Sequence, residues 1–509
     1  MYRRLLRKLN EQQVRKNDEY EIKRSKNLSK MVETVQNIIG ESDDIVQRDF
    51  KVGSRLSASL FFVDGLAFDS GIEDRIIRPL IHYAKVNDEY NPEKFVTYLL
   101  EEVVTFIEAK EVETFDEAIL SLMSGETLLV IDTIDKLILF ETRQFNQRGI
   151  EEPQSEVIVR GPRDGFNEVL HTNVMLIRRR LRDPNLTVQF GQLGRRSKTD
   201  FAIVYVKGIT NQDLVEEVRY RLSCIDLDLL SETGVIEQYI EENVMSPFPQ
   251  VLRTERPDKT IHALTNGKVI VVVDGSPFVL MAPVTFADLM KSTEDNYDRW
   301  QISSFIRLLR YFAAFMAVFL PGLYIAMVSY HQGMIPTVFA LSIAGTREGV
   351  PFPGFIEAFL MEVTFELLRE AGIRLPRPIG QTIGIVGGLV IGDAAVRAGI
   401  VSPIMVIVVA ITAIASFAIP AYNVSITFRL LRFVVMIAAA MFGLFGIVIV
   451  YILINIHLVG LRSFGSYYTS PFAPYKFGEW LDLMIRAPLI LLKNRPSEPK
   501  ILDKKRKEM

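Results

Sequence analysis

The chain has 509 residues, and its 58 Lys and Arg residues against 61 Asp and Glu residues give a formal net charge of −3. This balance argues against a nucleic-acid-binding protein, which needs a strongly basic surface. The single cysteine, Cys224, excludes an internal disulfide and a cysteine-rich metal site, and we expect it to be buried as a small apolar residue. Charged residues are concentrated before residue 300, whereas long uncharged runs lie within 311–461. We therefore expect the region before residue 300 to lie in water and much of the region after it to lie in lipid.

Residues 1–44 form a basic N-terminal arm that begins MYRRLLRKLN. No apolar core or small-residue cleavage site follows the basic residues, so the arm is not expected to be a signal peptide and is expected to stay in the cytosol. It either contacts anionic lipid or remains solvated. The basic C-terminal tail, residues 481–509, has the same two interpretations.

Residues 45–150 are predicted to form a first α/β lobe. The runs ASLFFVDGLAF and GETLLVIDTIDKLILFET are rich in β-branched or aromatic residues and are bounded by Gly and Asp, which predicts strands. Between them, PEKFVTYLLEEVVTFIEAKEVETFDEAILSL has helical spacing of its apolar residues. The polar, proline-containing segment TRQFNQRGIEEPQSE marks the end of this lobe.

Residues 151–298 are predicted to form a second α/β lobe. In VIVRGPRDGFNEVLHTNVMLIRRRLRDPNL, a Gly- and Pro-rich turn precedes an amphipathic helix that stops before Pro184. The segment TDFAIVYVKGITNQDLVEEVRYRLSCID reads as strand, turn and helix. In GKVIVVVDGSPFVLMAP, Asp274 and Gly275 between apolar runs predict a hairpin. The basic run at residues 178–182 is expected to serve a lobe or subunit interface, or to attract anionic headgroups, rather than nucleic acid.

Residues 299–480 are predicted to form an α-helical polytopic membrane domain. Residues 311–330 are uncharged and match the ~20 residues that cross ~30 Å of hydrocarbon. The segments 398–428 and 433–461 can each supply one more span, and 378–399 is a further candidate that charges interrupt. The number of spans is therefore between four and six.

The charges that flank the spans give conflicting indications of topology. Arg299, Arg307 and Arg310 precede the first span, and together with the basic tail they place both ends in the cytosol and make the number of spans even. Arg429 and Arg432 oppose this arrangement, because a last span that ends inside would begin with both arginines outside. Part of the preceding region or the tail would have to re-enter the membrane to remove the conflict.

The segment 355–371 is predicted to be an amphipathic helix beside the spans. Glu362, Glu366 and Glu370 fall on one face, which must lie against headgroups or against water inside an assembly, because a carboxylate in lipid is costly. Glu357 lies off this face. It is either a first-turn acid favoured by the helix dipole or a pore or hinge residue that pairs with an arginine of another helix.

Two neighbouring segments also carry unusual features. Residues 331–354 place several Gly and Pro residues around one short apolar run, which is typical either of a re-entrant or gating element or of an external loop. Downstream, small residues recur every four positions, which predicts a helix-packing face. Asp393 and Arg397 are one turn apart and can pair, either as a structural pair or as part of an ion pathway. The packing residues are Gly384, Gly388 and Gly392.

Long strings of this sequence resemble one known family, the A subunits of bacterial spore germinant receptors, or GerA-type spore germination proteins. The strings are VIVRGPRDGFNEVLHTNVMLIRRRLRDPNL, GRRSKTDFAIVYVKGI, IEENVMSPFPQ, EGVPFPGFIEAFLMEVTFELLREAGIRLPRPIGQTIGIVGGLVIGDAAV and SPFAPY. The resemblance implies a nutrient-sensing subunit in the inner membrane of the endospore, acting with a transporter-like B subunit and a lipoprotein C subunit. It also implies an oligomeric, ligand-gated ion channel whose conduction path is lined by the membrane domain. The charged residues described above are our pore or gating candidates within that domain: Glu357, Glu362, Glu366, Asp393 and Arg397.

Three other functions are alternatives to a receptor subunit. A secondary transporter also binds ions at broken helices. Such a protein is expected to contain two topologically repeated halves, and the sequence shows no internal repeat. A paralogue associated with dipicolinate release belongs to the same family and is hard to separate from the receptor subunits. A membrane-tethered enzyme is not expected, because no P-loop, HExxH, GxSxG or Cys/His cluster is present. No cofactor or metal is expected either.

Overall fold

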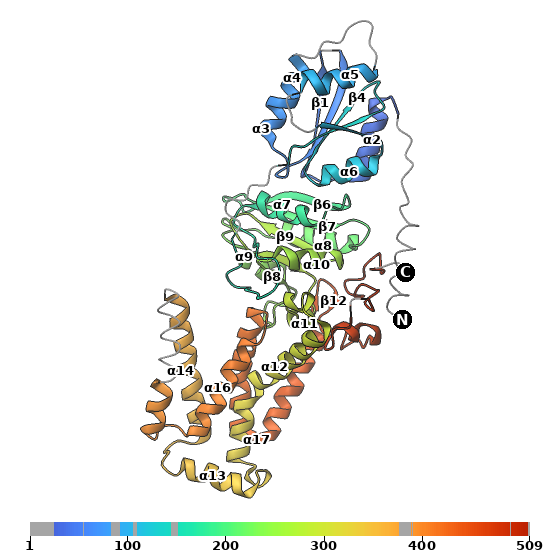
Figure 1. The fold of residues 1–509 in the computed structure, drawn as a ribbon. Coiled ribbons are helices and arrows are strands. Elements are labelled where there is room, and N and C mark those ends of the chain that lie inside the picture. The colour runs from blue at the N-terminus through green and yellow to red at the C-terminus, as the bar shows by residue number, and fades with distance from the viewer. Residues whose placement is uncertain are drawn as a thin grey trace. The chain divides into compact units, whose positions relative to one another are not determined.

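A computed structural model describes residues 25–506, except 54, 83–91, 105–108, 144–150, 376–387, 389 and 489. Its contacts divide the chain into two compact units, whose elements are drawn in Figure 1. The α/β unit comprises Met1–Glu242, Val251–Pro283 and Ile490–Met509, and the helical unit comprises Asn243–Gln250 and Val284–Leu489. The predicted fold class, an α/β region in two lobes followed by a helical region, is confirmed.

The first lobe of the α/β unit is a five-stranded antiparallel sheet covered by helices on both faces. Its strand order is β1-β2-β4-β5-β3, and β4 and β5 are buried along their whole length. The strands are β1 Ile45–Val52, β2 Leu56–Val63, β3 Ala109–Val112, β4 Thr127–Ile131 and β5 Leu137–Phe140. Along β2, Leu60 packs in the cluster formed with the helices between β2 and β3, and its neighbour Phe61 is buried outside that cluster. Alternate side chains therefore serve the two faces.

The helices of this lobe are short. They are α2 Leu28–Ile39, α3 Asp69–Ile72, η1 Glu73–Ile77, α4 Arg78–His82, α5 Pro92–Tyr98, η2 Leu99–Val103 and α6 Phe115–Met123. The predicted strands are confirmed, but the stretch from Pro92 to Leu122 is more than a helix, because β3 interrupts it at Ala109–Val112. This strand lies at the edge of the sheet, where, among the described strands, it pairs with β5 alone.

The second lobe repeats the plan with a sheet of order β6-β7-β9-β10-β8. The strands are β6 Leu186–Leu193, β7 Thr199–Val206, β8 Leu252–Thr254, β9 Val269–Val273 and β10 Val279–Ala282, and the helices are α7 Leu170–Arg180, α8 Gln212–Ser223, α9 Thr233–Ile240 and α10 Pro257–Thr265. The predicted turn between β9 and β10 is confirmed, with Gly275 at φ 80°. Cys224, which ends α8, is exposed, so its predicted burial is wrong.

One arginine of the basic run is buried between the two lobes. Arg178 is fully buried and donates from Nε and Nη2 to the carboxylate of Asp44, at 2.7 and 2.8 Å. Its Nη2 also donates to Ser42 Oγ at 2.9 Å. Asp44 directly precedes β1 of the first lobe, whereas Arg178 belongs to α7 of the second. The bidentate pair therefore joins the lobes. For Arg178, this agrees with the prediction that the basic run at residues 178–182 serves a lobe interface.

The C-terminal segment is not a separate tail. Residues 490–506 belong to the α/β unit and pack on its second lobe, where Ile501 is buried against Gly267 and the Leu502 N–H donates to Ile209 O at 3.0 Å. The Lys505 N–H and the Arg495 guanidinium both bond the Asp503 carboxylate and lower its pKa from the ordinary value. The predicted tail 481–509 is thus divided, because residues 481–488 lie in the helical unit.

The helical unit is built on two long apolar helices. These are α12 Trp300–Ser329 and α17 Tyr422–Gly460, and within the described residues they alone are long and apolar enough to cross a membrane. The other elements are α11 Phe286–Leu289, η3 Thr293–Asn296, η4 Gln332–Met334, α13 Thr337–Arg347, α14 Gly354–Arg374, α16 Pro403–Phe417, β11 Arg462–Ser463, β12 Ser466–Tyr467 and η5 Phe477–Asp482. Gly388 and residues 390–397 are also helical.

The long helix α17 reverses direction at its middle. Gly443 has φ 61° and ψ −140°, which no helix contains, and a Cβ on Gly446 would collide with the carbonyl oxygen of Ala438. In a straight helix, residues eight positions apart are about 12 Å apart along the axis. The chain therefore folds back on itself, and α17 is a hairpin of two antiparallel helices (Figure 1). The uncharged run 433–461 contains the turn rather than one uninterrupted span.

The segment 331–354, predicted as either a re-entrant element or an external loop, contains a helix. Its apolar run forms α13, whose side chains are mostly exposed and whose buried residue is Ile343. Pro353 then precedes α14 as its N-cap. Pro336 likewise precedes α13 as its N-cap, so prolines of this segment mark the starts of two helices, whereas Gly345 lies within α13.

Candidate functional site: the ion pairs of helix α14

Glu357 joins three helices of the helical unit. It lies in the first turn of α14 and is 0% exposed. Its Oε1 accepts from Arg347 Nη2 at 2.9 Å, and its Oε2 accepts from the backbone N–H of Ser402 at 2.8 Å. Arg347 ends α13, and Ser402 is the N-cap of α16. The arginine from another helix that we considered for Glu357 is therefore present.

Glu362 and Arg432 form a second buried pair. Glu362 is 4% exposed, and its Oε2 accepts from Arg432 Nη1, while Arg432 Nε donates to the carbonyl oxygen of Ala317 at 2.7 Å. The pair connects α14 to α17 and α12. In the part of the chain that the structure describes, Glu362 Oε1 and Arg432 Nη2 are buried without a hydrogen-bond partner. One oxygen and one nitrogen of the pair thus lack a hydrogen bond, which makes this arrangement less stable than a fully bonded one.

Glu366 pairs with Arg429 one turn further along α14. Its side chain is 45% exposed, whereas Arg429 is buried. The neighbouring Arg369 lies 4.0 Å from Glu366, donates to Ser416 Oγ at 3.2 Å, and stacks on Phe417 at 4.6 Å from the ring centre. Because successive glutamates meet arginines in descending order, α14 runs antiparallel to the first half of α17.

The remaining pore or gating candidates, Asp393 and Arg397, are exposed. Asp393 and Arg397 pair with each other at 2.9 Å on an exposed helix surface, so they are not buried in the described chain. A Cβ on Gly388 would lie 3.6 Å from Phe365, and one on Gly392 would lie 3.4 Å from Val406, both ordinary contact distances. The contacts of these two glycines therefore do not require a residue without a side chain. Gly384 lies outside the described residues.

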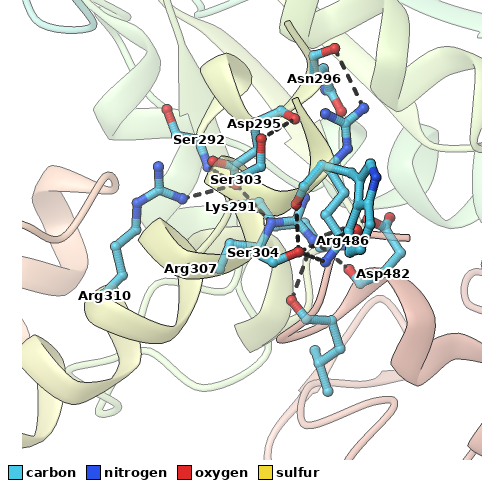
Figure 2. A network of polar contacts seen from close by, with 12 residues as sticks. Lys291, Ser292, Asp295, Asn296, Ser303, Ser304, Arg307, Arg310, Asp482 and Arg486 are labelled. Carbon is cyan, nitrogen blue, oxygen red and sulfur yellow. Dashed lines mark hydrogen bonds and ion pairs between the residues drawn. The ribbon is translucent and has the colours of Figure 1, made fainter. Parts of the chain in front are cut away.

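A second polar network holds the start of α12, and we name it the collar (Figure 2). Asp295 Oδ2 accepts from Arg307 Nε and from Arg310 Nη1, both at 2.8 Å, and Arg307 also donates to Asp482 Oδ1 at 3.0 Å. Ser304 Oγ accepts from the N–H of Arg486 at 3.0 Å. The collar thus ties the first turns of α12 to η3 before it and to η5 after the last helix.

The collar changes the interpretation of the flanking arginines. The sequence uses Arg307 and Arg310 as positive charges that mark the cytosolic side of a span; in the structure both are buried and paired. Their partners Asp295 and Asp482 were not singled out in the sequence, since neither lies in a recognisable motif. Likewise Arg429 and Arg432 do not flank a span; they lie within α17 and neutralise glutamates of α14.

The chemistry available at this site is that of paired charges. In the described ranges, no group of three or more His, Cys, Asp and Glu side chains is placed to hold a metal ion. What the arrangement can do is store and exchange ion pairs between helices, and a few ionisable residues among apolar helices usually mark a functional path.

Comparisons with known proteins agree with the resemblance seen in the sequence. Residues 33–498 match the model of the family described as Bacillus/Clostridium GerA spore germination protein. The chain is 45% identical to spore germination protein GerLA of Bacillus cereus, over 92% of this chain and 95% of that protein. It is 40% identical to spore germination protein KA of Bacillus subtilis (strain 168), over 95% of this chain and 88% of that protein.

A solved structure is also similar in sequence to part of the chain. It is the crystal structure of the N-terminal domain of the A subunit of the Bacillus megaterium spore germinant receptor GerK3, which is 30% identical and covers 52% of this chain and 97% of that chain, with a TM-score of 0.42. The family match over nearly the whole chain and the identity to full-length relatives decide the assignment. This chain belongs to the GerA family of spore germination proteins.

Proposed function

We propose that the chain is the A subunit of a germinant receptor in the inner membrane of the endospore and that it forms an oligomeric, ligand-gated ion channel. The observation that carries the proposal is the set of buried ion pairs that link α14 to its neighbours, Glu357 with Arg347 and Glu362 with Arg432. As part of the same proposal, the chain acts with a transporter-like B subunit and a lipoprotein C subunit and has no catalytic role of its own.

The free-energy cost of breaking these buried ion pairs is what a gating element requires. Removing one partner of a buried pair leaves an uncompensated charge, which costs about 3–5 kcal/mol in proteins. Helix α14 can therefore move only if its glutamates exchange arginines or meet water. Two stable arrangements separated by such a barrier are the physical basis of a switch. Glu366, which is half-exposed beside the buried Glu362, is the glutamate of these interhelical pairs that is open to the surroundings of the helical unit.

The surface of the helical unit supports a membrane location and assembly. Large apolar side chains are exposed along both halves of α17, including Phe442, Phe445 and Leu453. Exposed apolar surface of this extent needs lipid or another subunit to cover it. This surface is consistent with the membrane location and the homo-oligomeric assembly that we propose.

The order of the units along the chain supports an even number of crossings. The long stretch Val284–Leu489 of the helical unit begins after one part of the α/β unit and ends before another, Ile490–Met509. Because one compact unit occupies one side of a membrane, the chain must return to the side from which it left. In the proposal that side is the cytosol, where the basic N-terminal arm also lies.

Cation flux tests the proposal. Spores whose germinant receptor carries this subunit should release cations when a mixture of L-amino acids, sugars and nucleosides is added, and variants of Glu362 should change the response at equal receptor level. Flux that requires stoichiometric movement of one solute would instead indicate a secondary transporter. Spores that germinate normally with this subunit deleted, but release dipicolinate slowly, would indicate the paralogue associated with dipicolinate release.

A further inference from the structure

The segment NVMSPFPQ, residues 243–250, is a loop of the second lobe that folds as part of the helical unit. It follows α9 and precedes β8, both in the α/β unit, yet its own contacts are with the helical unit. The sequence resemblance singles out this string, but neither the ion pairs of α14 nor the collar uses it. We name it the 243–250 loop.

Hydrogen bonds and two prolines constrain the conformation of the loop. Its base is closed by two hydrogen bonds, from the Asn243 N–H to Gln250 Oε1 at 3.0 Å and from Gln250 Nε2 to Asn243 O at 2.8 Å. Inside it, Ser246 Oγ accepts from the N–H of Phe248 at 3.2 Å. Pro247 and Pro249 fix their own φ angles on either side of Phe248. A loop of this construction moves as a whole when the lobe that carries it moves.

The loop contacts both ends of the α17 hairpin. Phe248 is 2% exposed, and its ring lies 6.4 Å from that of Phe428 in the first half and 6.0 Å from that of His457 in the second half. Ser246 Oγ lies 2.8 Å from His457 Nε2, and Thr427 Oγ1 donates to the carbonyl oxygen of Pro247. The loop therefore bridges the two ends of the hairpin.

The segment after α17 holds the loop from a third direction. Tyr468 donates its hydroxyl to Pro249 O at 2.9 Å, and Ser463 donates to Gln250 O at 2.7 Å. Ser463 in turn accepts from the N–H of Val284 at 3.0 Å, just where the chain enters the helical unit. Pro247 and Phe248 thus contact α17, and Pro249 and Gln250 bond the segment after it.

We propose that the 243–250 loop is the element through which the second lobe controls the α17 hairpin, with Phe248 and Ser246 as its positioning residues. A displacement of α9 moves the constrained loop, and the loop shifts the two ends of α17 relative to each other. Because α17 also carries Arg429 and Arg432, a shift of its first half strains their pairs with α14. The coupling between the loop and α17 does not depend on the proposed function; the consequence that it gates ion flow rests on the proposed function.

Hydrogen exchange of the full chain in lipid nanodiscs tests the coupling itself. Ile236 is buried in α9, so Ile236→Ala loosens α9 within the second lobe. In the wild-type background this change should speed amide exchange at residues 424–428 and 457–460 by about threefold or more. In a Phe248→Ala background, where exchange at these ends is already faster, Ile236→Ala should add nothing. In a Met245→Ala background the response should persist, because Met245 lies in the same loop but is 91% exposed.

Equal responses in the Phe248→Ala and wild-type backgrounds, or no response in the wild type, would overturn the inference. If Phe248→Ala prevents folding, Ser246→Ala replaces it, since it removes only the hydroxyl that meets His457 and the Phe248 N–H. Phe248→Leu should restore part of the coupling by refilling the contact. Cation flux from liposomes made with the same proteins separates the two proposals: coupling without flux refutes the channel alone, and flux without coupling refutes the role of the loop alone.

Discussion

The three acidic residues on one face of α14 should differ sharply in what their neutralisation costs. Glu362 is buried with Arg432, Glu366 is half-exposed beside Arg429, and Glu370 is exposed and pairs with Arg374 on its own helix. Glu362→Gln keeps an amide oxygen that can accept from Arg432, but it removes the counter-charge and leaves the Arg432 charge buried and uncompensated, which should cost about 3–5 kcal/mol. Water can reach the Glu366 pair, so Glu366→Gln should cost about 1 kcal/mol. The surface pair of Glu370 should cost less than about 0.5 kcal/mol.

Intrinsic fluorescence offers a direct assay of this order. The chain has two tryptophans, Trp300 and Trp480, and both belong to the helical unit. Unfolding of the full chain in SDS-containing mixed micelles, followed by tryptophan fluorescence, therefore reports on that unit. The expected order of destabilisation is Glu362→Gln, then Glu366→Gln, then Glu370→Gln as the matched control. At 1.4 kcal/mol per factor of ten, the first should shift the folding equilibrium by about 10² or more.

A charge swap separates the pair from the general effect of a substitution. The double variant Glu362→Arg with Arg432→Glu should recover part of the stability that each single change loses, because the attraction is restored in reverse. If Glu362→Gln unfolds at the same SDS fraction as Glu370→Gln, the buried pair does not hold α14 and the reasoning about a gate fails.

Three further predictions concern the rest of the chain. Arg178→Ala should destabilise the α/β unit by about 3–5 kcal/mol in urea, because it leaves Asp44 buried without its bidentate partner, whereas Arg179→Ala, on the exposed side of α7, should have little effect. Gly443→Val should disrupt the reversal of α17, since its φ of 61° disfavours a side chain and a Cβ would lie 2.9 Å from the ring of His331; unchanged yield and unchanged exchange across the turn would contradict this. Gly267→Val should expel Ile501 and expose the C-terminal segment to trypsin, and a segment as resistant as in the wild type would refute its docking.

Local patterns were sufficient for most elements of the α/β unit. Strands β2, β4 and β7, helices α7 and α8, and the β9–β10 turn follow from residue type, spacing and turn residues within each segment. Strand β3 was missed because its four residues lie inside a stretch with helical spacing, and its strand state depends on pairing with β5 further along the chain. Pairing of this kind is not visible in the period of a single segment.

The turn within α17 was missed for a different reason. Uncharged sequence continues on both sides of Gly443, with no proline or charge to mark a break. The reversal depends on a glycine that adopts positive φ and on Gly446, which allows the two halves to approach closely. Isolated glycines are common in membrane helices, so neither residue alone distinguishes a turn from a helix that continues.

Helical periodicity predicts part of the candidate site, namely which acidic residues share a face of α14. Helical spacing correctly placed Glu362, Glu366 and Glu370 on one face of α14, but it does not say whether that face meets water, headgroups or counter-charges. In the structure, that face meets two arginines of α17, Arg429 and Arg432. The two arginines are about one helical turn apart, as are Glu362 and Glu366, but they lie far from the glutamates in the sequence. The matched spacing of two opposite charges on two helices is the signal that would have predicted the pairs.

Reconstitution of the chain alone in liposomes tests the central claim most directly. Purified protein is inserted into vesicles with a potassium gradient, cation flux is recorded, and the size of the inserted species is measured in the same sample. The account predicts an oligomer that passes cations, with a flux that Glu362→Gln alters and Glu370→Gln leaves unchanged. Tight vesicles that hold a monomer, or flux that responds equally to both substitutions, would contradict it.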